Sequence, residues 1–118
     1  MRSLIEHPLA LRQHASVMLP PPAEGFAHVL VQDNLNAPAF ERGDVLLANL
    51  AHTTWRYDGP YVLELHGKQV VRYVQDRGVK GSLYVYYLTA MELGQFIPIG
   101  ELTILAAVTA ANTTRRVA

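Results

Sequence analysis

Apolar and polar residues alternate with a period of two from Phe26 onward, which is the pattern of strands that bury one face. The segments with this pattern are rich in Val, Leu, Ile and Tyr, and turn residues separate them. We expect strands at 26–32, 44–50, 60–66, 69–75, 82–88 and 102–110. His66-Gly67-Lys68 predicts a tight hairpin, and residues 76–81 predict a looser one. Because no long helical pattern lies between the strands, the sequence predicts a mainly β, antiparallel fold.

The residues before Phe26 follow a different pattern and are expected to form an arm. Residues 8–19 predict a short helix, with Pro8 in its first turn. The prolines within residues 19–25 then favour an extended connector. The chain is therefore divided into an N-terminal arm at 1–25, a β domain at 26–112 and a C-terminal tail at 113–118.

Composition and charge exclude several classes of function. The chain has 118 residues, of which 50% are hydrophobic, and this is enough for one domain with a modest core. Ten basic residues balance ten acidic ones, which argues against direct binding of nucleic acid. Without cysteine there are no disulfides or thiolate sites, and the five histidines follow no ligand spacing, so we expect neither a metal nor another cofactor. No apolar run is long enough to span a membrane and no signal peptide is recognised, so we expect a cytoplasmic protein.

Residues 31–44, VQDNLNAPAFERGD, place a polar loop between two predicted strands and close it with Gly43-Asp44. Further along, an Asp58-Gly59 turn precedes a strand, and a glycine introduces the last strand at 100–110. This order of motifs resembles the LexA-like peptidase family, which includes the C-terminal domains of SOS and phage repressors and shares its fold core with type I signal peptidases. The resemblance covers most of the predicted β domain and implies a LexA/signal-peptidase-like antiparallel β fold with a short N-terminal arm.

Members of this family use a serine nucleophile, whose proton is taken by a neutral lysine. Two registers are open for the serine position. Counting back from Gly43-Asp44 places Asn34 there, and we prefer this register. Counting back from residues 38–40, PAF, places Leu35 there instead. Neither residue offers a hydroxyl group.

The segment KQVVRYV, residues 68–74, is similar to the family strand that bears the catalytic lysine, and it carries Arg72. A guanidinium stays protonated in proteins and cannot act as a base. The resemblance therefore implies a catalytically degenerate domain, with Asn34 and Arg72 at the two positions of the dyad. Two arrangements are open: the side-chain oxygen of Asn34 accepts a hydrogen bond from Arg72, or Arg72 points to solvent.

For function, the resemblance implies a non-catalytic module for oligomerisation or protein binding in phage- or SOS-type transcriptional regulation. It also implies a homodimer and, as a further partner, a repressor-type protein. Two alternatives stay open. One is an active serine autopeptidase whose dyad is misaligned or substituted, and the other is an unrelated small β-barrel binding module whose Gly-Asp and Asp-Gly turns match by chance.

Two surfaces are candidates for these contacts. The last predicted strand is apolar on both faces between residues 104 and 108, and a second chain would cover the face that the core does not. The expected interface residues are Ile104, Leu105, Ala107 and Val108. The alternative is a central strand covered by the N-terminal arm. Trp55, Arg56 and Tyr57 form a candidate contact loop, for which simple edge packing is the alternative.

Overall fold

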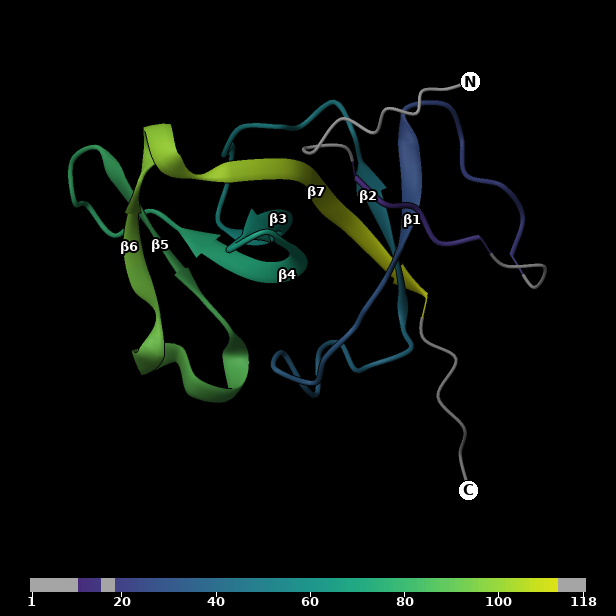
Figure 1. Ribbon diagram of the computed structural model, residues 1–118, viewed down its shortest axis with the longest axis horizontal. Helices are drawn as coiled ribbons and strands as arrows, with labels where there is room; N and C mark the ends of the chain where they lie inside the picture. Colours follow the sequence, from purple (N-terminus) through teal and green to yellow (C-terminus); the bar gives the residue numbers. More distant parts are fainter. Residues whose placement is uncertain (1–10, 16–18, 113–118) are drawn as a thin grey trace.

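The computed structural model describes residues 11–15 and 19–112, and it places their strands in one sheet (Figure 1). The strands are β1 (Phe26–Leu30), β2 (Val45–Asn49), β3 (Gly59–Leu65), β4 (Lys68–Gln75), β5 (Ser82–Tyr86), β6 (Gln95–Pro98) and β7 (Thr103–Asn112). Two 3-10 helices, η2 (Leu88–Leu93) and η3 (Ile99–Glu101), flank β6. The strand order is β1-β2-β7-β3-β4-β5-β6, and every neighbouring pair is antiparallel. The predicted mainly β, antiparallel fold is confirmed.

The tight hairpin between β3 and β4 is also confirmed. Leu65 pairs with Lys68, and the two residues between them have positive φ, 52° for His66 and 78° for Gly67. A two-residue turn with both residues in the left-handed region matches the twist of the flanking strands. Glycine takes that conformation freely, so Gly67 is the residue that makes the turn easy to form.

The arm differs from its prediction. Residues 11–15 form no helix, and the backbone N–H of His14 instead donates to the carbonyl oxygen of His28 in β1 at 2.7 Å. Gln69 in β4 holds the backbone of Arg12 by two bonds, accepting from its N–H at 2.7 Å and donating to its carbonyl oxygen at 3.2 Å. The helix prediction is wrong for residues 11–15, because the sheet supplies partners for their backbone groups. Most other positions of that predicted helix lie outside the described residues.

The strand that the sequence did not predict is β6, which has only four residues and ends at Pro98. Its position is set by its pairing with β5, in which Phe96 stands opposite Tyr84 with 5.0 Å between the ring centroids. β6 is the last strand of the sheet, and a proline is tolerated at such an edge because no further strand needs its N–H.

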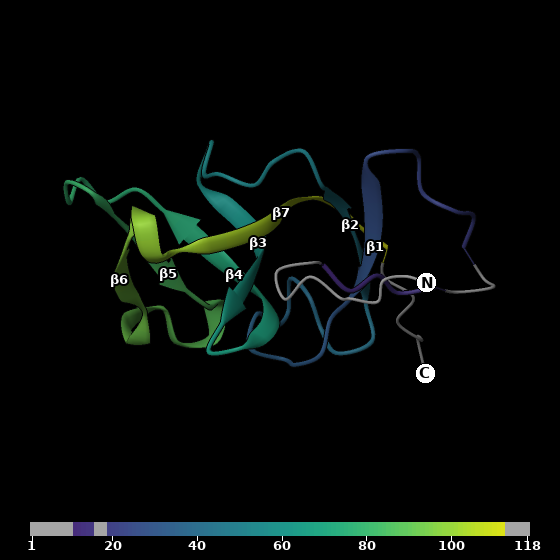
Figure 2. The ribbon, with the colours of Figure 1, turned by 45° about the horizontal axis from the view of Figure 1, so that its top comes forward.

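The core lies on both faces of the central strands β3 and β7. Tyr61 and Leu63 of β3 pack into one cluster, whereas Val62 between them packs into a second cluster on the opposite face. β7 runs from the β5–β6 end of the molecule to the β1–β2 end (Figure 2). Within the described residues, no helix is long and apolar enough to span a membrane.

The interface predicted on β7 requires a correction, because the chain itself covers the four residues that were expected to form it. Ile104 and Val108 are each 8% exposed and Ala107 is 0% exposed. Leu105 is the extra residue at a β-bulge opposite β3, and it packs partly buried against the cluster that contains Val62. The uncovered face that motivated the interface is therefore not present at these residues. The alternative of a central strand accounts for the apolar pattern, and the homodimer stays a prediction without this interface.

Candidate functional site

The loop at residues 31–44 connects β1 to β2 and is closed at its base by the backbone. The N–H of Val31 donates to the carbonyl oxygen of Asp44 at 2.9 Å, and the N–H of Gly43 donates back to the carbonyl oxygen of Val31 at 3.0 Å. Asp44 is 3% exposed, and its carboxylate accepts the N–H of Glu41 at 2.8 Å. Gly43 has a φ of 95°, where a side chain would be strained. The Gly43-Asp44 motif thus serves to close the loop.

Arg72 of β4 reaches the loop and contacts Asp33. Its Nη1 atom lies 3.4 Å from Oδ2 of Asp33 and donates to the carbonyl oxygen of Val71 at 2.7 Å. The guanidinium carbon is 5.6 Å from the ring centroid of Tyr87. The Arg72 side chain is only 12% exposed, so the alternative in which it points to solvent is wrong.

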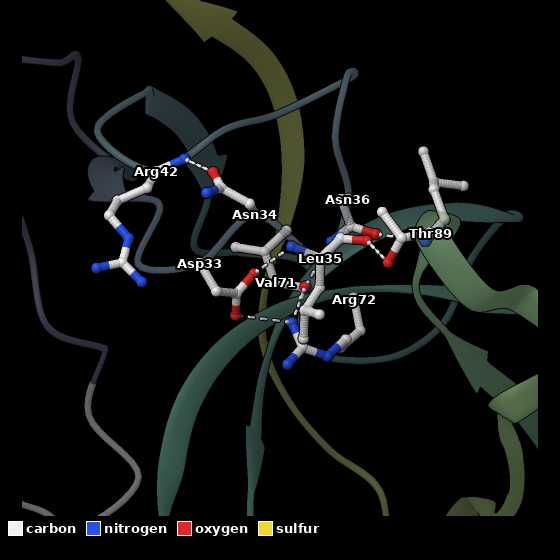
Figure 3. Close-up of polar contacts among 9 residues, drawn as sticks. Asp33, Asn34, Leu35, Asn36, Arg42, Val71, Arg72 and Thr89 are labelled. Atoms are coloured by element: carbon white, nitrogen blue, oxygen red, sulfur yellow. Dashed lines mark hydrogen bonds and ion pairs between the residues drawn. The ribbon is translucent and has the colours of Figure 1, made fainter.

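Asn34 does not meet Arg72 in this arrangement. Its Oδ1 atom accepts the backbone N–H of Arg42 at 2.8 Å, and its side chain points toward Arg42 and away from Arg72 (Figure 3). The predicted hydrogen bond between Asn34 and Arg72 is therefore wrong. Leu35 points in the direction of Arg72 in the same view. Of the two registers considered from the sequence, only the one with Leu35 at the serine position directs that residue toward Arg72.

Asn36, which the sequence analysis did not single out, is the buried polar residue of the loop tip, at 3% exposed. Its Nδ2 atom donates to the carbonyl oxygen of Val71 at 2.9 Å, and its Oδ1 atom accepts the N–H of Leu88 at 3.0 Å. Because Tyr73 pairs with Tyr86, the same register would place Val71 opposite Leu88, two residues beyond that last pair. The amide of Asn36 stands between them and completes the ladder from a side chain. No local pattern predicts this role, since it depends on two strands distant in the sequence.

A second tie joins the loop tip to η2. The carbonyl oxygen of Leu35 accepts both the backbone N–H of Thr89, at 3.0 Å, and the Thr89 hydroxyl, at 2.8 Å. The N–H of Leu35 in turn donates to Oδ1 of Asp33 at 3.0 Å. The polar groups at the loop tip are thus engaged in contacts that position the loop itself (Figure 3).

The chemistry available at the junction, where the loop at residues 31–44 meets β4 and η2, is limited. Ser82 is the only serine within residues 11–15 and 19–112, and it begins β5 opposite Pro98 rather than facing the loop. The hydroxyl of Thr89 is already a donor to Leu35. In the part of the chain that the structure describes, no three His, Asp or Glu side chains gather into a candidate metal site. Neither the Ser82 nor the Thr89 hydroxyl is therefore free beside a base, and the described residues here form no set of metal ligands.

The candidate contact loop is held mainly by Tyr61. The Tyr61 hydroxyl accepts the backbone N–H groups of Arg56 and Tyr57, both at 3.1 Å, and donates to the carbonyl oxygen of Tyr57 at 2.6 Å. Trp55 packs partly buried against the cluster that contains Tyr61, as the edge-packing alternative expects. Tyr57, at 43% exposed, is the aromatic residue of this loop that faces solvent.

A row of aromatic rings crosses β4, β5 and β6 on the face that carries the loop. The successive centroid distances are 6.2 Å from Phe40 to Tyr73, 5.7 Å from Tyr73 to Tyr86, 5.6 Å from Tyr86 to Tyr84 and 5.0 Å from Tyr84 to Phe96. Burial raises the pKa of Tyr73, and the neighbouring Tyr86 adds to this effect. Burial also raises the pKa of Tyr86. The charge of Arg77 lowers this pKa, whereas the charge of Asp58 raises it further.

A cleft of about 360 Å³ opens next to this row, where β4 and β5 stop pairing. Its lining includes Arg72, Tyr86, Leu93 and Phe96. One of its lining residues, Arg72, also contacts Asp33 of the loop. In comparisons with known proteins, no family model, no curated protein and no solved structure matches this chain.

Proposed function

We propose that this chain is a non-catalytic domain of the LexA-like type that acts as a protein-binding or oligomerisation module in phage- or SOS-type transcriptional regulation. The observation that carries the non-catalytic part is the bonding of the loop tip. Asn34, Asn36 and Asp33 each hold a backbone N–H or a strand edge in place, and Arg72 is paired with Asp33. A peptidase of the LexA-like type would need a nucleophile and a base in this loop and at residue 72.

The chemistry of the side chains supports the same proposal. An amide is not a nucleophile toward peptides, and Leu35 has no polar atom to offer. Arg72 cannot give up its proton to become a base, and its Nη1 atom already contacts Val71 and Asp33. These residues therefore favour the non-catalytic proposal over an active autopeptidase.

A role in binding is supported by apolar side chains on the surface. Six large apolar residues are exposed in the described part of the chain, and four of them lie between residues 91 and 99: Met91, Leu93, Phe96 and Ile99. They come from η2, β6 and η3, at one end of the sheet. A concentration of exposed apolar area is typical of a surface that contacts other proteins.

The two parts of the proposal are tested separately. The purified protein is incubated at alkaline pH, which favours the neutral form of an amine base, and its intact mass is followed over time. The expected result is an unchanged mass, and a specific fragment that appears without added protease would overturn the non-catalytic assignment. Light scattering over a range of protein concentrations then measures the predicted homodimer. A monomer at every concentration would remove oligomerisation and leave only a protein-binding role.

A further inference from the structure

The cleft beside β4 lies where β4 and β5 separate. β4 pairs with β5 only from Tyr73 to Gln75, although it pairs with β3 from Lys68 to Val74. Beyond Tyr73, the side chain of Asn36 stands between the strands, and the chain turns away into η2. The resulting hollow of about 360 Å³ is within the size range of pockets that accept side chains or small ligands.

One wall of the cleft is apolar and open to solvent. Leu93 is 64% exposed and Phe96 is 45% exposed, and both line the cleft. Gly94 between them fixes their position, because a Cβ atom there would lie 2.6 Å from the ring of Tyr84 and 2.6 Å from the carbonyl oxygen of Val85. Only glycine lets the chain approach β5 so closely, and this approach holds Leu93 and Phe96 at the rim.

The charged groups of the cleft are predominantly acidic. Glu64 of β3 and Glu101 of η3 both line it, and neither side chain makes a hydrogen bond or an ion pair with another described residue. Arg72 also lines the cleft, but its charge is offset by Asp33 at 3.4 Å. The cleft therefore presents two carboxylates that attract a cation, next to an apolar surface that loses contact with water when a ligand covers it.

We infer that this cleft binds an extended peptide segment that carries a lysine or arginine beside an apolar residue. The cation lies against Glu64 and Glu101, and the apolar side chain covers Leu93 and Phe96. This inference deepens the proposed function and rests on it, because it names the partner chemistry of a module that binds without cleaving. Both contacts are needed, since exposed ion pairs alone are weak.

The test uses a dye-labelled peptide, Thr-Thr-Arg-Arg-Val-Ala, which has the required chemistry and copies the sequence of residues 113–118. Fluorescence anisotropy measures its binding to the full chain. Replacing both carboxylates, Glu64→Gln with Glu101→Gln, is expected to weaken binding about tenfold. Leu93→Ser, at an exposed position that the fold does not need, is expected to weaken it by a similar factor.

The matched control carries Glu24→Gln and Glu92→Gln, which remove two charges at exposed positions outside the cleft lining. It should bind as the unaltered protein does, and a peptide with glutamate in place of both arginines should not bind. The inference is overturned by no binding at millimolar protein, by equal loss in the control, or by binding that survives in the Glu64 and Glu101 variant. The mass of the peptide after incubation separates the two proposals. Cleavage would contradict the non-catalytic function, whereas an intact but unbound peptide contradicts only the cleft.

Discussion

Asn36 donates from its Nδ2 atom to the carbonyl oxygen of Val71 at 2.9 Å, at the point where the ladder between β4 and β5 stops. A side-chain amide has the same donor and acceptor as a peptide group, so it can complete a ladder between strands that have begun to separate. The loop at residues 31–44 is consequently linked to β4 and to the start of η2 through the Asn36 side chain. Its polar composition, which suggests a reactive site in the sequence, serves this mechanical role in the structure.

Asn36→Ala is expected to lower the free energy of unfolding by about 2 kcal/mol, because the part-buried N–H of Leu88 loses its acceptor and the carbonyl oxygen of Val71 loses one of two donors. Urea unfolding of the variant measures the change. Asn34→Ala is the matched control, since it removes an equivalent amide whose bond to Arg42 is exposed to solvent. An Asn36→Ala variant as stable as the control would contradict the role of Asn36 between the strands.

Asp33 and Arg72 are expected to stabilise each other only modestly. Their side chains are 33% and 12% exposed, and pairs that solvent reaches contribute about 0.5 kcal/mol. A double-mutant cycle with Asp33→Asn and Arg72→Met measures the coupling, and these replacements keep most of the side-chain volume. The coupling should fall as salt is added, because ions screen the pair. A coupling that is zero at low salt would show that the two charges do not interact in solution.

The directions of the loop side chains distinguish the two registers for a serine position. Asn34 faces Arg42, so the hydroxyl of Asn34→Ser would point away from residue 72 even when Arg72→Lys supplies an amine. We expect that pair of changes to leave the protein inactive. Leu35→Ser with Arg72→Lys places the hydroxyl and the amine on the same side, and it is the combination expected to gain any cleavage activity. Intact mass after alkaline incubation compares the two variants, and cleavage by the Asn34→Ser pair alone would reverse the assignment.

The sheet could largely be predicted from the sequence, because alternation of apolar and polar residues reports which face of a strand is buried. This worked for β3 and β4, whose pattern and His66-Gly67 turn agree with the structure. It failed for β6, because four residues are too few to show a period and the pairing of Phe96 with Tyr84 depends on distant parts of the chain. The helix predicted in the arm was wrong for a related reason, because Gln69 and β1 supply hydrogen-bond partners that a local helix pattern does not reveal.

The candidate site was harder to predict than the sheet. The sequence brought attention to the correct loop and to Arg72, and these do meet in the structure. Which loop residue meets Arg72 is decided by turn geometry at the level of single residues, and Asp33 rather than Asn34 takes the contact. The apolar pattern of β7 was also ambiguous, because burial by a second chain and burial in the middle of a sheet give the same sequence.

The burial of β7 gives a prediction about Ala107. Its side chain is 0% exposed, so Ala107→Glu would place a carboxylate in the core without a partner. We expect a loss of at least about 3 kcal/mol in the free energy of unfolding, seen by urea unfolding or as a failure to fold. Ala110→Glu is the matched control on the same strand, where the side chain is exposed, and it should stay close to the unaltered protein. Equal effects of the two changes would mean that Ala107 is not buried by its own chain.

The aromatic row predicts how stability depends on alkaline pH. Burial, reinforced by the neighbouring Tyr86, raises the pKa of Tyr73 above its ordinary value of 10.0. The folded state then keeps the phenolic proton at a pH where the unfolded chain releases it, so the proton-bound form favours folding below pH 10.0. This stabilisation is fully present below the unfolded pKa, and it is lost as the pH rises through the higher pKa of the folded state.

Urea unfolding on both sides of pH 10.0 should show that the free energy of unfolding declines with pH for the unaltered protein and declines less steeply for Tyr73→Phe. Tyr57→Phe, which removes a hydroxyl from a ring that is 43% exposed, serves as the control and should keep the original slope. A Tyr73→Phe variant with an unchanged slope would show that Tyr73 does not couple folding to proton binding.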